Sequence, residues 1–147
     1  MNGERKNLIK LTNCIYRGTQ AYLNEVLGKY NLGSGTYPYL LMLARNEGIN
    51  QNQISKELDV DKAMSARVIK KMIDIGYIRK ETDQNDSRAY KLFLTEKARL
   101  VIPDIKMELR KWNDLITQNL SEQEKDVILD LLEIVLKDTK KYRNRES

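Results

Sequence analysis

Two short helical segments joined by a tight turn, with two extended segments after them, constrain the fold of this 147-residue chain more than any other feature. A capping-box variant at Asn50 and Gln53 opens a predicted helix over residues 51–58. Asp61 is placed to cap a second helix over 62–75, and a glycine follows where a left-handed C-terminal residue is needed. Two such helices with about three residues between them are typical of a helix-turn-helix.

After residue 76 the pattern changes from helical to extended. Residues 77–80 and 89–94 carry strand-forming side chains, and the polar run 82–87 separates them. The sequence therefore predicts a β-hairpin whose polar loop projects into solvent or toward a partner.

Long amphipathic helices are predicted on both sides of this central region. Apolar residues recur at helical spacing from Lys6 to Lys29, and three glycines within 28–35 end that helix. Thr36 is predicted to cap the next helix, which is apolar nearly all round and ends at Gly48.

The C-terminal third has the same helical character. Thr95 is predicted to cap a helix that reaches about Asn119, bent near Pro103, and Ser121 with Glu124 forms a capping box for the last helix. The apolar face of that last helix comprises Val127, Ile128, Leu131, Leu132, Val135 and Leu136. A long apolar stripe needs a covering surface, and a second copy of the chain is a natural supplier.

Composition narrows the classes of function. Hydrophobic residues make up 41% and charged residues 32% of the chain, which contains no histidine and a single cysteine. Without histidine, the commonest metal ligand and general base, we expect no catalytic residues, no metal site, no cofactor and no enzyme activity. No apolar run reaches the roughly 20 residues that span a bilayer, so we expect a cytoplasmic protein without a membrane partner.

The distribution of charge favours a polyanionic partner. The net charge is +5, and residues 60–91 hold eight Lys or Arg against five acidic residues. A basic stretch of this kind, over a helix-turn-helix pattern, is typical of double-stranded DNA binding.

The helix over 62–75 divides into two faces on a helical wheel. Ser65, Val68, Ile69 and Met72 lie on one side, and Ala63, Arg67, Lys70 and Asp74 on the other, flanked by Met64 and Lys71. In a DNA major groove, Arg67 can bridge guanine acceptors, Ala63 and Met64 can touch thymine methyl groups, and Lys62, Lys70 and Lys71 are further contact candidates, the last two for phosphates. The alternative is an ordinary amphipathic helix with a solvated basic face.

The hairpin loop carries a second candidate DNA contact. Arg88 on a thin loop can enter the narrow, electronegative minor groove, and Asp86 can hold its guanidinium in one orientation. The alternative is a solvent-exposed ion pair with little energetic effect.

Several of these motifs, in this order and spacing, resemble the multiple-antibiotic-resistance-regulator (MarR) family. The resemblance is carried by Gln53-Ile54-Ser55-Lys56-Glu57-Leu58, Asp61-Lys62-Ala63, Arg67-Val68-Ile69-Lys70-Lys71-Met72, Gly76-Tyr77-Ile78, Asp86-x-Arg88, Leu92-x-Leu94-Thr95, Tyr16-Arg17 and Gly33-x-Gly35-x-Tyr37-Pro38. It implies a mainly α fold with a small β-hairpin wing, in which residues 1–147 form one domain. Dimerisation helices are expected at about 5–30 and 98–143, and the winged helix-turn-helix region at about 36–96.

The resemblance also implies a function. It points to a homodimeric transcriptional regulator, usually a repressor, that binds a pseudo-palindromic operator and releases it when a small amphipathic or aromatic effector binds. The sequence departs from the family pattern in three places. Ser87 in place of a second basic residue bears on the affinity of the wing, and Met64 in place of a small hydroxyl residue bears on base preference. Lys97-Ala98 stand within the usual Leu-Thr-x-x-Gly.

Two further sites are candidates. Tyr16, Tyr37, Tyr39 and Trp112 could line an aromatic effector cavity, although aromatic residues at helical spacing also build cores. Cys14 resembles the N-terminal-helix cysteine of peroxide-sensing members, with Arg17 or Lys10 as a source of positive charge; alternatively it is a small apolar residue in a dimer-facing stripe. For the function of the chain as a whole, a further alternative is a winged helix that contacts only other proteins.

Overall fold

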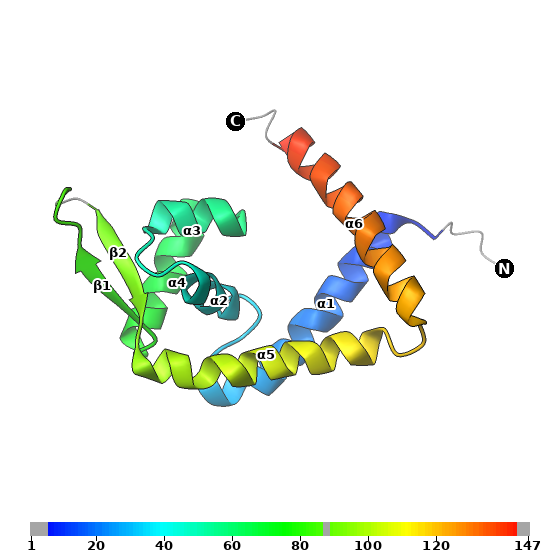
Figure 1. Cartoon of the computed structure of the whole chain (residues 1–147), viewed down its shortest axis with the longest axis horizontal. Coiled ribbons are helices and arrows are strands. Elements are labelled where there is room, and N and C mark those ends of the chain that lie inside the picture. Colours follow the sequence, from blue (N-terminus) through cyan, green and yellow to red (C-terminus); the bar gives the residue numbers. More distant parts are fainter. Residues whose placement is uncertain (1–5, 87–88, 144–147) are drawn as a thin grey trace. The chain divides into compact units, whose positions relative to one another are not determined.

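The fold was analysed in a computed structural model, which describes residues 6–86 and 89–143 (Figure 1). Its elements, in chain order, are α1 (Leu8–Leu27), the 3-10 turn η1 (Gly28–Tyr30), α2 (Tyr37–Arg45), α3 (Gln51–Leu58), α4 (Lys62–Asp74), β1 (Ile78–Thr82), β2 (Tyr90–Leu94), α5 (Glu96–Ile116) and α6 (Glu122–Arg143). A mainly helical chain with one two-stranded hairpin confirms the predicted fold class. The chain divides into two compact units, residues 1–110 and 111–147, with the boundary inside α5.

The predicted caps of α3 and α4 are confirmed. The Asn50 carboxamide oxygen accepts from the Gln53 backbone N–H, and the Gln53 side chain accepts from the Asn50 N–H, each at 2.8 Å. The Asp61 carboxylate accepts from the Met64 N–H at 2.7 Å. Asp59, between the two helices, is in the left-handed region with φ 55° and ends α3. These local bonds satisfy backbone donors that have no partner inside a helix.

α2 begins at Tyr37, as predicted, but its predicted side-chain cap and its predicted end are wrong. The Thr36 hydroxyl does not cap the helix, because it accepts from the Gly33 N–H at 2.8 Å within the preceding turn. The helix ends at Arg45 rather than at Gly48, because the backbone of residues 48 and 49 forms hydrogen bonds with the edge of β2. Gly48 adopts φ 88°, which few residues other than glycine tolerate.

The hairpin is antiparallel, and β1 ends at Thr82, two residues beyond the predicted end of the first strand. Its register pairs Ile78 with Leu94, Lys80 with Leu92 and Thr82 with Tyr90. On the other edge of β2, the Gly48 N–H donates to the Leu92 carbonyl at 2.8 Å, and the Leu92 N–H donates to the Ile49 carbonyl at 3.0 Å. The segment after α2 therefore closes one edge of the sheet.

One continuous core holds the first unit together. Every α-helix and strand from α1 to α5 contributes buried side chains: Leu23, Leu27, Tyr39, Leu40, Leu43, Ile54, Ile69, Met72, Ile78, Leu92, Leu94, Ala98, Ile102 and Ile105. Packing of α4 and the hairpin into the same core fixes the position of one relative to the other.

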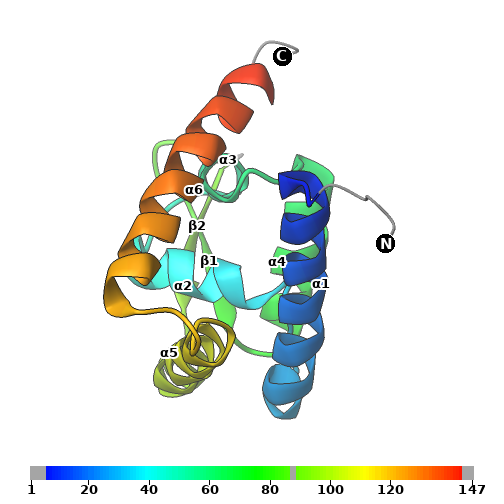
Figure 2. The same cartoon turned by 90° about the vertical axis from the view of Figure 1, so that its right-hand side faces the viewer.

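Two tyrosine–carboxylate bonds join the C-terminal end of α1 and the adjoining η1 to α5, which lie side by side in Figures 1 and 2. The Tyr22 hydroxyl donates to Glu108 at 3.2 Å, and the Tyr30 hydroxyl donates to Asp104 at 2.8 Å. Burial, followed by the bond to Glu108, raises the pKa of Tyr22, and the bond to Asp104 is the main cause of the raised pKa of Tyr30. Both phenols therefore stay protonated and able to donate at neutral pH.

The second unit contains the last turns of α5 and the whole of α6. The capping box of α6 is confirmed, since the Ser121 N–H donates to Glu124 at 2.8 Å and the Glu124 N–H donates to the Ser121 hydroxyl at 3.1 Å. α5 runs through Pro103 without interruption and ends at Ile116, three residues before the expected end. None of the 22 residues of α6 is buried.

Candidate nucleic-acid interface

The position of α4 is fixed at both ends. The Asp61 cap determines where it begins. At its C-terminal end Gly76 adopts φ 88°, and the Tyr77 N–H donates back to the Met72 carbonyl at 2.8 Å. This left-handed ending turns the chain directly from α4 into β1, so the helix and the hairpin are held in a fixed relation.

The predicted division of α4 into two faces is confirmed. Ser65, Ile69 and Met72 are buried and Val68 is half-buried. The predicted DNA contacts Lys62, Ala63, Met64, Arg67, Lys70 and Lys71 are all exposed. These six residues form one outward-facing ridge. In it, three lysines and the apolar side chains of Ala63 and Met64 surround Arg67. This ridge presents hydrogen-bond donors and apolar atoms, which are the groups that read base edges in a major groove.

A groove lies on each flank of this ridge. On one side, a groove of about 710 Å³ runs between α4, the first turn of α3 and the hairpin, with Lys70, Lys80 and Tyr90 among its lining residues. On the other side, a groove of about 520 Å³ lies between Lys71, Asn24 and the loop before α2. The sequence analysis missed Lys80 and Tyr90, although alternation along the strands from Ile78 would have placed Lys80 on the hairpin face that carries Ile78.

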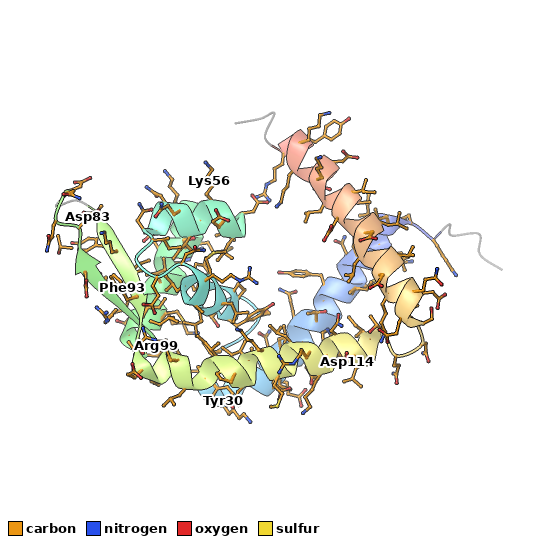
Figure 3. The ribbon with its side chains drawn as sticks, in the orientation of Figure 1. Tyr30, Lys56, Asp83, Phe93, Arg99 and Asp114 are labelled. Carbon is orange, nitrogen blue, oxygen red and sulfur yellow. The ribbon has the colours of Figure 1, made fainter. Side chains whose placement is uncertain are left out.

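The hairpin loop contains the other predicted DNA contact. Asp86 is exposed, and its carbonyl accepts from the Ala89 N–H at 3.0 Å. Arg88 lies outside the described residues, so its predicted pairing with Asp86 stays a prediction. Figure 3 labels Asp83 near the end of the hairpin, whereas Phe93, also labelled, lies nearer its base.

Of the four predicted effector residues, Tyr39 lies in the core. Its side chain is 2% exposed, and its hydroxyl is 3.2 Å from the hydroxyl of Ser65, which is fully buried on the inner face of α4. This bond joins α2 to α4 across 26 residues of sequence. Tyr39 is therefore placed to hold α4 in position.

The other three effector candidates lie nearer the surface. Tyr37 is half-buried in α2, and its pKa is raised by burial and, to a smaller extent, by the neighbouring Tyr16, which is exposed on α1. Tyr16 therefore lies within electrostatic range of Tyr37. Trp112 is half-buried in the second unit.

Cys14, the redox candidate, is exposed on α1. The Arg17 guanidinium donates to its sulfur at 3.3 Å, as expected for one of the two predicted cationic neighbours. Among the residues that the structure describes, no group of three or more acidic or cysteine side chains is arranged to hold a metal ion. In the same described ranges no helix has the length and apolar character required to cross a bilayer.

A short helix, a tight turn, a second helix with an exposed basic ridge and an adjoining β-hairpin define the winged helix-turn-helix class of DNA-binding proteins. Residues 35–90 match the model of the MarR family. The chain is 35% identical over 121 residues to the HTH-type transcriptional regulator BilQ of Clostridioides difficile, a match that covers 82% of each protein.

Solved structures of MarR-family regulators support the same family assignment. A MarR transcriptional regulator from Methanosarcina mazei is 34% identical, with a TM-score of 0.86 over 92% of this chain and 97% of that one. A MarR-family regulator from Listeria monocytogenes, solved in complex with a 26mer DNA, is 27% identical, with a TM-score of 0.84 over 91% and 89% of the two chains. This chain therefore belongs to the MarR family of helix-turn-helix transcriptional regulators.

Proposed function

We propose that the protein is a homodimeric repressor that binds a pseudo-palindromic operator and releases it when a small effector binds. The observation that carries this proposal is the outward ridge of α4, whose opposite face is locked into the core. Two copies of such a ridge related by a twofold axis would meet two half-sites on one side of the duplex.

Each side chain of the ridge has a distinct role in this proposal. Arg67 donates to guanine, while Ala63 and Met64 contact thymine methyl groups. Lys70 and Lys71 neutralise phosphates, and Lys62 adds positive charge at the start of the helix. The wing completes the contact, with Arg88 in the minor groove and Asp86 orienting it. The complex of the Listeria relative with a 26mer DNA supports DNA as the partner.

Exposed apolar surface on the terminal helices supports a homodimer. In α6, eight apolar residues are between 36% and 60% exposed: Val127, Ile128, Leu129, Leu131, Leu132, Ile134, Val135 and Leu136. The first half of α1 exposes Leu8, Ile9, Leu11 and Ile15. Apolar patches of this size on soluble proteins mark interaction surfaces. In this proposal, residues 1–147 act as one domain whose helices at about 5–30 and 98–143 form the dimer.

The effector is a small amphipathic or aromatic molecule that binds beside Tyr37 and Tyr16. A half-buried phenol next to an exposed one offers both a ring surface and a donor. A ligand that shifts Tyr37 would also shift Tyr39, two residues along α2, and through its bond to Ser65 would move α4. Release of DNA then follows from a change in the angle of the recognition helix.

A second candidate function is redox sensing through Cys14. The exposed thiol with the Arg17 guanidinium 3.3 Å from its sulfur supports this alternative, because reactive cysteines occur beside positive charge. If oxidation releases the operator, a Cys14→Ser variant should keep full DNA affinity after treatment with hydrogen peroxide, whereas the parent should lose it. Equal behaviour of both proteins would exclude this function.

The deciding experiment is footprinting of the purified full-length chain on fragments of its source genome, combined with sedimentation to measure its oligomeric state. We expect protection of a pseudo-palindrome by a dimer and an affinity that falls steeply with salt concentration. A monomer at micromolar concentration that ignores duplex DNA even at low salt would contradict the proposal. That result would favour a winged helix that contacts only other proteins.

A further inference from the structure

The turn that follows α4 is bonded at three successive carbonyls to Thr95 and Lys97, at the start of α5. The Lys97 ammonium donates to the Ile75 carbonyl at 2.6 Å, and the Thr95 hydroxyl donates to the Gly76 carbonyl at 2.6 Å. The Thr95 N–H donates to the Tyr77 carbonyl at 3.1 Å. The last carbonyls of a helix have no partner inside that helix. Here α5 supplies the donors, so the end of α4 is attached to α5.

Lys97 is exposed, yet its side chain is held at two further points. Its ammonium nitrogen is 4.8 Å from the centroid of the Tyr77 ring. Its stem lies against Gly76, since a Cβ atom at Gly76 would meet the Lys97 Cδ at 3.7 Å. Tyr77 is itself fixed, because it is 2% exposed and its hydroxyl donates to the Tyr30 carbonyl at 2.6 Å. The ammonium of Lys97 therefore has a defined position at the end of α4.

Gly76 makes this helix ending easy to distort. It adopts φ 88°, and glycine has access to more backbone conformations than any other residue. Lys97 restrains it from outside, through its stem and through the bond to the adjacent Ile75 carbonyl. A positive charge at the C-terminal end of a helix also stabilises the helix dipole. Loss of the Lys97 ammonium would remove the charge and the donor together, and Ile75 would turn to water.

We propose that Lys97 is a positioning residue for operator binding, which caps α4 from α5 and so fixes the tilt at which α4 presents its ridge; this inference rests on the proposed function. α5 is a suitable anchor, because Glu108 and Asp104 bond it to Tyr22 and Tyr30. In a homodimer, the tilt of each recognition helix determines which spacing of half-sites the protein accepts. The charge of Lys97 acts inside the protein, so Lys97 makes no phosphate contact.

The first measurement uses the protein without DNA. Lys97→Met removes the charge and keeps a long stem, Lys97→Arg keeps the charge, and Lys106→Met is a matched control that removes another exposed charge from α5. Hydrogen exchange is followed by mass spectrometry at Gly76 and Tyr77, whose N–H groups bond to carbonyls of α4. These amides should exchange about 2- to 5-fold faster in Lys97→Met, as expected for the loss of a charged helix cap. Lys97→Arg and Lys106→Met should keep the parent rates.

The second measurement uses the footprinted operator and a copy with one base pair inserted between its half-sites. A recognition helix held at one tilt discriminates between the two spacings, so the parent should bind the inserted copy much more weakly. In Lys97→Met the affinity for the operator should fall by about 3- to 30-fold, because each subunit of a dimer loses the cap. Affinity for the inserted copy should change little, so discrimination falls by the same factor. Fluorescence anisotropy over a range of salt concentrations should give the parent slope.

The outcomes separate this proposal from the proposed function. Lys97→Ala serves as a second uncharged variant, and circular dichroism verifies that each protein is folded. Parent exchange rates at Gly76 and Tyr77 in both uncharged variants would overturn the proposal without reference to DNA. Faster exchange with unchanged discrimination would overturn it too, because the cap would then serve stability alone.

A salt slope lowered by about 0.9 for each subunit would identify Lys97 as a phosphate contact instead, and would also overturn the proposal. In each of these cases a parent protein that binds its operator keeps the proposed function intact. If the parent binds no duplex, the proposed function fails, and the role of Lys97 in operator binding fails with it even where the exchange rates confirm the cap.

Discussion

The buried bond between Tyr39 and Ser65 allows a quantitative test of how α4 is held. The two side chains are 2% and 0% exposed, and their hydroxyl oxygens are 3.2 Å apart. Ser65→Ala leaves the Tyr39 phenol in the core without this partner, which should lower the free energy of unfolding by about 1–3 kcal/mol. Tyr39→Phe should cost less, about 0.5–1.5 kcal/mol, because a serine inside a helix can turn to the carbonyl four residues before it.

The double variant removes both hydroxyls and leaves neither unsatisfied. Its loss of stability should therefore be smaller than the sum of the two single losses by about 0.5–1.5 kcal/mol. Urea unfolding at one fixed protein concentration measures all four proteins, since the stability of a dimer depends on concentration. Ser65→Ala should also weaken operator binding, because α4 loses its link to α2. Additive losses, or a Ser65→Ala protein as stable as the parent, would refute this account.

Three other predictions concern DNA contacts and helix ends. Arg67→Ala should lose about 1–3 kcal/mol of operator binding and relax base preference. Lys71→Ala should instead weaken binding to all DNA sequences alike and lower the salt slope by about one for each subunit. Competition binding with mutated operators distinguishes these two effects. Asp61→Ala removes the cap of α4 and should lower the free energy of unfolding by about 0.5–2 kcal/mol in urea titrations. The bond from the Ser121 N–H is the main cause of the lowered pKa of Glu124. Its stabilising effect is complete above the ordinary glutamate pKa and is lost as the pH falls through the lower folded value, so thermal unfolding of Glu124→Gln should depend less on pH in the acid range.

Sequence reasoning succeeded where the determinants are local. The cap at Asp61 and the capping box at Asn50 need only residues three positions apart, and both form as predicted. The burial of one face of α4 followed from the spacing of Ile69 and Met72. In each case the physical cause lies within one or two helical turns.

It failed where a neighbouring turn competes for the same group, and where a site depends on how distant segments pack. Thr36 was predicted to cap α2, but its hydroxyl bonds to Gly33 in a turn that packs against α1 through Asn24. The groove that contains Lys80 depends on the register of the hairpin and on the docking of α4, neither of which the spacing of residues along the chain determines. The dimer and the effector remain predictions.

α2 and the short segment that follows it are together bonded to both elements that we expect to meet DNA. Within α2, Tyr39 contacts Ser65 of α4, and just after its end Gly48 and Ile49 bond to Leu92 of β2. A tilt of this one helix would therefore carry the recognition helix and the wing with it. A ligand that moves α2 would therefore not have to contact either DNA-binding element. The contacts of α4 and of the wing with the operator would weaken together rather than one after the other.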